Sequence, residues 1–225
     1  MTPAEVNPQG LLPPPPREGS TEQQAELAEL HRIQDARTPA DLAQAEWDNA
    51  HEDPSAFAAT LGPKFDMAKL PATARLLLTI EHEQSAAKKL AKVAFHRPRP
   101  WVLDPTLVGC AHADDKPNSS YPSGHTTMAF AMAVTLADLI PDRAGDIFAR
   151  AQQYGQSRLV CGVHYRSDII AGQVLGTAVG VELLHSPALR ADLDAARQEL
   201  HAAGIAPSAS TDRSGAVRRR SHGVA

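Results

Sequence analysis

The segment SDIIAGQVLGTAVGVELLH, residues Ser167–His185, contributes most to deciding the fold. Apolar residues dominate it, and Gly172, Gly176 and Gly180 recur at four-residue spacing. Residues four apart share one face of an α-helix, so the glycines predict a helix face that a second helix can approach closely. Glycine rows of this kind also join membrane helices. The polar residues and the length of this segment favour a core helix of a folded domain.

Five further segments show apolar patterns with a helical period, separated by Pro and Gly. Thr21 is a predicted N-cap with Gln24 three residues later, and Pro39 stands at a favoured first helical position. The further predicted helices are Thr21–Asp35, Thr38–Glu52, Pro71–Phe95, Thr126–Ile140 and Asp142–Arg158. In the longest of them, a buried stripe is predicted for Leu76, Leu77, Ile80, Leu90 and Val93.

Composition points to the same fold class. The chain has 225 residues, of which 43% are hydrophobic, 21% charged and only 4% aromatic, and alanine is the commonest residue. This balance favours helices packed on small faces over a β-sandwich, and the length suits one core. We therefore predict an all-α fold, a single compact helical domain over residues 21–205. Pro-rich residues 1–20 are predicted to form an extended arm outside the core, and residues 206–225 a flexible tail.

Charge and hydropathy exclude two classes of partner. The formal net charge of −4 argues against nucleic acid, because that affinity depends on Lys and Arg. No uninterrupted apolar stretch reaches about 18 residues, so we predict a soluble chain without membrane spans. The first residues lack the charged and apolar regions of a signal peptide. Composition leaves two alternatives open, a cytosolic protein and an exported protein whose signal has been removed.

The first cluster of candidate site residues contains Lys92 and, seven residues later, Arg99, which is followed by proline. Lys92 lies near the end of a predicted helix and Arg99 just beyond it, so both cations can reach one point if the Pro-containing segment folds back. Along the same helix, Glu81, Ser85 and Lys88 share a face with Lys92. Taken alone, such charges are usually solvated surface groups.

The second cluster is the loop Tyr121–Thr126, which leads directly into an apolar predicted helix. Free N–H groups at a helix start, with the Ser123 hydroxyl and the open backbone of Gly124, can cradle an anion. His125 can donate a proton to a leaving group or serve as a structural cap, and the loop alone does not decide between these roles.

The third cluster joins Ser157 and Arg158 with His164 and Asp168. Four residues separate His164 from Asp168 near a helix start, so the carboxylate can hold one ring nitrogen and direct the other toward a substrate. The planar guanidinium of Arg158 matches two phosphate oxygens. A purely structural His–Asp pair at this spacing is the alternative.

In order and spacing, the three clusters resemble the three-part signature of the type 2 phosphatidic acid phosphatase superfamily. The matching pattern is Lys92-x6-Arg99-Pro100, then Pro122-Ser123-Gly124-His125, then Ser157-Arg158-x5-His164-x3-Asp168. Within that superfamily the chain is most similar to the soluble bacterial class A nonspecific acid phosphatases, which residues 11–16, 120–126 and 155–158 also resemble. The resemblance extends over Leu11–Ile205.

The resemblance implies a helical domain of the acid phosphatase and vanadium haloperoxidase type. Such a domain hydrolyses phosphate monoesters through a phosphohistidine, without a metal or other cofactor. His164 would attack phosphorus, Asp168 would orient it, and His125 would protonate the departing alkoxide. His125 would then activate water, while an alcohol in place of water would give phosphotransfer. The implied phosphate-binding residues are Lys92, Arg99, Ser123, Gly124 and Arg158.

The implied partners are small phosphomonoesters and inorganic phosphate, and small proteins of this family often form homo-oligomers. The candidate contacts of the leaving group are Glu81, Ser85 and Met128. His125 must be protonated to act as an acid, and neighbouring carboxylates and bound phosphate favour that form. The best turnover is therefore expected below neutrality.

The two cysteines, Cys110 and Cys161, gain meaning from the resemblance. In the cytosol both stay reduced, whereas in an exported protein they can form a disulfide. The class A acid phosphatases are typically periplasmic, so the resemblance implies a periplasmic or secreted protein. A Cys110–Cys161 bridge would then hold the catalytic loop against Leu103–Tyr121, a segment without helical period that is predicted to be a long loop.

Three alternatives remain. A vanadium-dependent haloperoxidase resembles the same motifs, because vanadate mimics a five-coordinate phosphoryl group at the same histidine. A non-catalytic phosphate-binding helical protein would keep the pocket without the chemistry, although no motif residue is missing here. A metal site is a further alternative, although polar loop clusters are usually solvated. Its candidate ligands are His112, Asp114 and Asp115, or His51 and Asp53.

Overall fold

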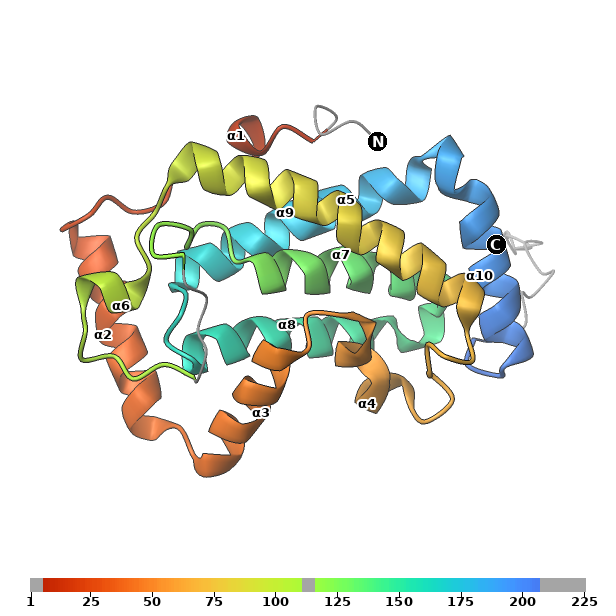
Figure 1. The fold of residues 1–225 in the computed structure, drawn as a ribbon, viewed down its shortest axis with the longest axis horizontal. Coiled ribbons are helices and arrows are strands. Elements are labelled where there is room, and N and C mark those ends of the chain that lie inside the picture. Colours follow the sequence, from red (N-terminus) through yellow and green to blue (C-terminus); the bar gives the residue numbers. More distant parts are fainter. Residues whose placement is uncertain (1–5, 111–115, 207–225) are drawn as a thin grey trace, which may run out of the picture.

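The computed structural model describes residues 6–110 and 116–206 of the chain. Within these ranges the regular elements are all helices, as predicted (Figure 1). The α-helices are α1 (Pro8–Leu11), α2 (Thr21–Ala36), α3 (Pro39–Ala50), α4 (Ala58–Leu61), α5 (Pro71–Phe95), α6 (Pro100–Leu103), α7 (Gly124–Leu139), α8 (Ala144–Val160), α9 (Arg166–His185) and α10 (Arg190–Ala202). The short 3-10 helices are η1 (Pro54–Phe57), η2 (Pro141–Arg143) and η3 (Pro187–Leu189).

Helix α7 is the centre of the fold, and α5, α8 and α9 pack around it (Figure 1). Every residue from Thr126 to Leu136 is buried. A helix covered on all sides must be apolar all round, which explains why this segment has no polar stripe. Ser123 caps its start, since the Ser123 hydroxyl accepts a hydrogen bond from the Thr126 N–H.

The glycine row of α9 lies against α7 and confirms the predicted close helix packing. A Cβ atom added to Gly172 would lie 2.8 Å from the Ser123 carbonyl oxygen, and one added to Gly176 would lie 2.4 Å from that of Thr127. A Cβ on Gly180 would lie 2.8 Å from the Val134 Cβ. Any side chain in this row would push the two helices apart.

The six helices predicted from sequence agree with α2, α3, α5, α7, α8 and α9 to within two residues at each end. Helix α10 was not predicted. The N-cap of α2 is Ser20 instead of Thr21, because the Ser20 hydroxyl accepts the Gln23 N–H. Helix α3 begins with a capping box formed by Thr38 and Asp41.

The predicted buried stripe of α5 is wrong at its C-terminal end. Leu76, Leu77 and Ile80 are buried, but Leu90 and Val93 are 47% and 80% exposed. The buried row continues instead through Gln84, Ala87 and Ala91. Two alanines take the buried positions at this end of the helix, and the larger Leu90 and Val93 lie off the row.

By length and composition, α9 is the one helix within residues 6–110 and 116–206 that could cross a membrane. Half of its apolar window is buried inside the fold. The core helices of proteins that do not enter membranes pass the same test, and the packing of α9 on α7 is that of a core helix.

The Pro-rich N-terminal segment packs on the domain, although composition predicted an arm outside the core. Val6 and Leu12 are buried in the main hydrophobic cluster. The Tyr121 hydroxyl donates a hydrogen bond to the Pro13 carbonyl oxygen at 2.6 Å. Val6 and Leu12, both before the run Pro13–Pro16, anchor the segment, and composition does not reveal this. Apart from Ala206, the predicted tail lies outside the described residues.

We expect Gly176→Ala to lower the free energy of unfolding by about 3 kcal/mol, because the new Cβ would meet α7 backbone in an overpacked core. Gly145→Ala is the matched control on α8, since no heavy atom lies within 4 Å of its added Cβ. That variant should match or slightly exceed the parent in stability, because Ala is the better helix former. Urea denaturation measures both, and equal stabilities would contradict the close packing of α7 and α9.

Candidate active site

The three predicted clusters meet at one end of the bundle. The first comes from the end of α5 and the linker after it, the second from the start of α7, and the third from the end of α8 and the start of α9. Arg99 contacts His164 at 2.9 Å, and the Ser123 N–H donates to the Asp168 carbonyl oxygen at 3.0 Å. The structure therefore brings together residues that are far apart in sequence.

Asp168 has no exposed surface and receives hydrogen bonds from three directions. Its Oδ2 accepts from the Ser120 hydroxyl at 2.6 Å and from the Tyr165 N–H at 2.8 Å. Its Oδ1 accepts from the Arg97 guanidinium at 2.6 Å. Burial raises the pKa of Asp168, and Arg97 with these hydrogen bonds opposes the rise. Donors on all sides match a carboxylate that accepts one more hydrogen bond from His164.

His164 is a neutral imidazole with a defined tautomer. Its Nδ1 lies 3.2 Å from the Asp168 Oδ2, so Nδ1 carries the hydrogen, and Nε2 accepts from the Arg99 guanidinium at 2.9 Å. Burial lowers the pKa of His164 well below its usual value, and the nearby charges of Arg99, Lys92 and Arg158 lower it further. The lone pair of Nε2 is consequently directed at the cations of the site.

Those cations are held by carbonyl oxygens of two loops and by the side-chain oxygen of Asn49 on α3. Arg99 is 2% exposed and donates to the Val163 carbonyl at 2.9 Å. Arg158 is 1% exposed, and its guanidinium donates to the Asn49 side-chain oxygen at 2.7 Å. The Lys92 ammonium donates to a backbone carbonyl, that of Ser119. Charges at such depth act through a low effective dielectric, which strengthens their attraction for an anion.

The start of α7 supplies backbone donors next to these cations. The buried Ser123 hydroxyl accepts from the Thr126 hydroxyl at 2.9 Å, so the Ser123 side chain is fixed in position. A Cβ added to Gly124 would lie 3.3 Å from the Lys88 ammonium nitrogen. The Lys88 ammonium therefore lies against the Gly124 backbone, where its charge adds to the positive end of the helix dipole.

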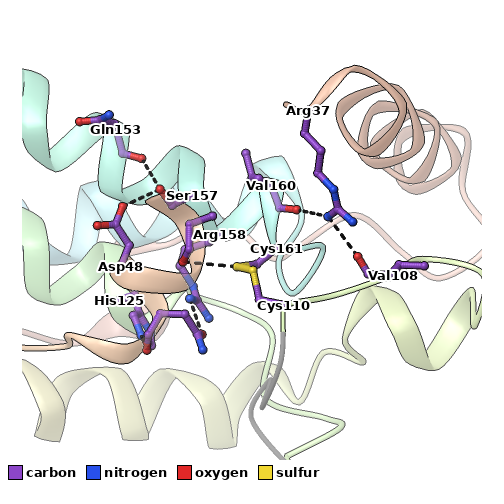
Figure 2. Close-up of a disulfide and its surroundings, with 12 residues drawn as sticks. Arg37, Asp48, Val108, Cys110, His125, Gln153, Ser157, Arg158, Val160 and Cys161 are labelled. Atoms are coloured by element: carbon purple, nitrogen blue, oxygen red, sulfur yellow. Dashed lines mark hydrogen bonds between the residues drawn. A yellow bond between two sulfur atoms is a disulfide. The ribbon is translucent and has the colours of Figure 1, made fainter. Parts of the chain in front are cut away.

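The surroundings of His125 favour its neutral form when no anion is bound. Its Nε2 lies 3.3 Å from the Asn49 carbonyl oxygen, and its ring stacks on Tyr154. Burial and the charge of Arg158, toward which Figure 2 shows it placed, lower the pKa of His125 to about 3. One neighbouring carboxylate, Glu52, opposes this effect, with its Oε2 3.7 Å from Nδ1. Burial outweighs the carboxylate, so His125 is neutral before an anion binds.

Sequence reasoning missed Glu52 as a site residue. Burial raises its pKa, but the charges of His125, Lys88 and Arg158 outweigh burial and lower that pKa to about 2. The Lys88 ammonium donates to Glu52 at 2.7 Å. The sequence offered one indication of the Lys88–Glu52 ion pair, which was the position of Lys88 on the same predicted helix face as Lys92.

The candidate leaving-group contacts are in different environments. Glu81 and Ser85 line a hollow of about 440 Å³ on the surface of α5. Burial and the charge of Glu52 raise the pKa of Glu81. Met128 has no exposed surface and belongs to the main hydrophobic cluster, where it serves packing.

The candidate metal ligands are only partly within the described residues. His112, Asp114 and Asp115 lie outside them. The His51 Nδ1 is 2.7 Å from the Trp47 carbonyl oxygen, and Asp53 accepts the Ser55 N–H at 2.7 Å. Within residues 6–110 and 116–206, no group of three or more His, Cys, Asp and Glu is arranged to hold a metal.

The structure confirms the Cys110–Cys161 disulfide (Figure 2). The Cα atoms are 4.7 Å apart across a sequence separation of 51 residues. The Cys110 N–H also donates to the Cys161 carbonyl at 3.3 Å. Arg37 of the loop after α2 reinforces this junction, since its guanidinium donates to the carbonyls of Val108 and Val160 at 3.1 and 2.7 Å. The turn between Arg158 and His164 is thereby held in place.

Comparisons with known proteins point to one family. The sequence model of the PAP2 superfamily matches residues 73–191. An acid phosphatase of Zymomonas mobilis is 38% identical over 151 residues, which cover 65% of this chain and 56% of that protein. A non-specific acid phosphatase of Providencia stuartii is 30% identical over 200 residues, 84% of this chain and 79% of that protein. A non-specific acid phosphatase of Salmonella typhimurium is 34% identical over 151 residues, which cover 64% of this chain and 59% of that protein.

The chain thus spans little more than half the length of the Zymomonas and Salmonella relatives. Among solved structures, LpxE of Aquifex aeolicus aligns with a TM-score of 0.58 at 22% identity, covering 72% of this chain and 96% of that one. A transmembrane PAP2-type phosphatidylglycerolphosphate phosphatase of Bacillus subtilis aligns with a TM-score of 0.56 at 18% identity, covering 73% and 85%. At these identities the likeness is one of fold.

Loss of the disulfide is expected to destabilise the fold and the site together. In the chain-entropy account, a bridge that closes a loop of this length contributes about 4 kcal/mol, so Cys110→Ser with Cys161→Ser should lower the free energy of unfolding by about that amount. Denaturant titration measures the change. Titration of the denatured, unreduced parent with a thiol reagent should find no free thiol, and two free thiols would refute the bridge.

Proposed function

Because the chain belongs to the PAP2 superfamily, we propose that it is an acid phosphatase that hydrolyses phosphate monoesters through a phosphohistidine at His164. One observation carries this proposal. Asp168 fixes the Nδ1 hydrogen of His164, and the opposite nitrogen, Nε2, faces the Arg99 guanidinium at 2.9 Å. A neutral nucleophile among buried cations is what an in-line attack on an anionic phosphoryl group requires.

In the first half-reaction the Nε2 lone pair of His164 forms a bond to phosphorus. The bond from phosphorus to the ester oxygen breaks, and its electron pair leaves with that oxygen, which takes a proton. Arg99 transfers its hydrogen bond from Nε2 to a phosphoryl oxygen as the substrate binds. The equatorial oxygens would be held by Lys92, Arg99, Arg158, the Ser123 hydroxyl and the Gly124 N–H.

His125 is the proposed donor of that proton. The Asn49 carbonyl can only accept hydrogen bonds, so Nε2 of His125 carries a hydrogen in both protonation states. Nδ1 is therefore the nitrogen that gains and loses a proton, and the Glu52 carboxylate stabilises its charged form. In the second half-reaction Nδ1 accepts a proton from water, the water oxygen binds phosphorus, and the bond from phosphorus to His164 breaks.

The buried cations supply charge that a divalent metal would otherwise provide, so we propose a metal-independent reaction. An alcohol in place of water would yield a new phosphate ester. Disulfides persist in oxidising compartments, which supports a periplasmic or secreted protein acting on small phosphomonoesters. The helical domain of residues 21–205 would carry the activity, with the N-terminal segment packed on it.

The phosphohistidine is tested by brief incubation with a labelled phosphomonoester and rapid quench. We expect an acid-labile, base-stable phosphoprotein that is absent in His164→Ala, with hydrolysis reduced at least about a thousandfold. His185→Ala, on the same helix at an exposed position, is the control and should retain both the phosphoprotein and the hydrolysis. Activity should survive exhaustive chelation. Full activity in His164→Ala would refute the proposal.

The pH dependence should follow the substrate, because His125 with a pKa of about 3 is uncharged in the free enzyme at pH 5 to 8 and has no proton on Nδ1 to donate. A phosphate monoester loses its second proton near pH 6, so only below about that pH does the ester bring the proton that His125 then passes on. We expect kcat/KM to fall about tenfold per pH unit above that value. For two aryl phosphates with different second pKa values, the fall of kcat/KM with rising pH should begin at correspondingly different pH values. A fall that begins at the same pH for both substrates would contradict the conclusion that the ester supplies the proton.

A further inference from the structure

Arg97 connects the reaction centre to a helix outside the three motifs. It lies in the linker between α5 and α6 and is only 3% exposed. One terminal nitrogen, Nη1, donates to the Asp168 carboxylate at 2.6 Å and to the Ser167 hydroxyl at 2.7 Å. The guanidinium carbon lies 3.9 Å from the centre of the Tyr165 ring. These contacts fix the guanidinium in one orientation.

The other terminal nitrogen of Arg97 binds Glu26 of α2. Nη2 donates to the Glu26 Oε2 at 2.7 Å, and the Glu26 Oε1 accepts the Ser167 N–H at 2.6 Å. The Glu26 side chain is only 11% exposed. A continuous chain of buried polar groups therefore runs from Glu26 through Arg97 and Asp168 to His164.

The charges along this chain have a direct consequence for the reaction. Two carboxylates and one guanidinium leave a net single negative charge next to the His164 ring. When Nε2 of His164 forms its bond to phosphorus, the ring becomes positively charged, and that net charge stabilises it. Without the Glu26 charge, Arg97 and Asp168 would neutralise each other, and the ring would lose much of this stabilisation.

We propose that Glu26 is a positioning residue for phosphohistidine formation, which acts on His164 through Arg97 and Asp168. The inference rests on the proposed function and adds a residue that lies outside the matching motifs. Glu26 contacts neither the substrate nor the reacting nitrogen. Its effect is to keep Arg97 from cancelling the charge of Asp168.

A second ion pair between the same helices separates this role from simple tethering. Glu29 of α2 accepts from the Arg166 guanidinium of α9 at 2.6 Å, with side chains 27% and 37% exposed. This pair joins α2 to the start of α9 as Glu26 does, but no hydrogen bond described for it reaches Asp168. Glu29→Gln is therefore the matched control for Glu26→Gln.

The test compares Glu26→Gln with Glu29→Gln in the full chain. The glutamine oxygen at residue 26 can still accept the Ser167 N–H, so the fold should survive. We expect Glu26→Gln to slow phosphoenzyme formation in a single turnover about tenfold with KM nearly unchanged, and Glu29→Gln to match the parent. The low-field proton NMR signal of the His164 Nδ1–H should move upfield in Glu26→Gln alone, because Asp168 becomes a weaker acceptor.

Each outcome decides between the alternatives. Equal phosphorylation rates and equal Nδ1–H signals in the two variants would overturn the role of Glu26 while leaving the phosphohistidine intact. A parent protein that forms no phosphoenzyme would overturn the proposed function, and the NMR signal would then decide the charge coupling alone. If the Glu26→Gln protein melts at a far lower temperature than the Glu29→Gln protein, Glu26→Asp is tested in its place. A rate of phosphoenzyme formation close to that of the parent in Glu26→Asp supports the charge role, and a rate as slow as that of Glu26→Gln refutes it.

Discussion

A carboxylate without exposed surface must obtain its hydrogen bonds from the protein, and the arrangement of the whole site follows from how Asp168 obtains them. Arg97 reaches it from the linker after α5, Ser120 from the loop before α7, and Tyr165 through its N–H at the start of α9. Leaving such a charge unpaired costs several kcal/mol. Because the donors come from three separate segments, satisfying Asp168 also fixes the ends of three helices relative to one another.

Helix packing determines how close those segments come. Gly172 lies one turn after Asp168 on α9, and the Ser123 carbonyl occupies the space that a side chain there would need. The Ser123 N–H in turn donates to the Asp168 carbonyl oxygen. The glycine row that packs α9 on α7 therefore also places the backbone donors of the loop before α7 next to the His164 pair, so core packing and site geometry depend on the same short distance.

Local patterns predicted those features of the site that depend on neighbouring residues. The four-residue spacing of His164 and Asp168 gave a correct contact, and the spacing of the glycines gave the correct helix face. Glu26 and Glu52 were not found, because each acts on a group far away in the chain, as Glu26 does on Arg97. No periodicity on α2 distinguishes Glu26 from the more exposed Glu29. Their functions differ only in what the tertiary fold brings against them.

The protonation of the two histidines was out of reach of the sequence for a related reason. A pKa depends on burial and on the sum of nearby charges, and the cations around His164 and His125 are assembled by the fold. The same cations that keep His164 neutral, with its lone pair available, also attract the phosphoryl anion. The negative charge of the bound phosphate ester offsets their charge, so the substrate removes much of the penalty for a positive ring at the moment the ring acquires that charge. Nucleophile and phosphate site are thus one electrostatic unit. Without a phosphoryl group the cations keep His164 neutral. With the phosphoryl group bound to Nε2, its negative charges offset those cations and the positively charged ring is stabilised.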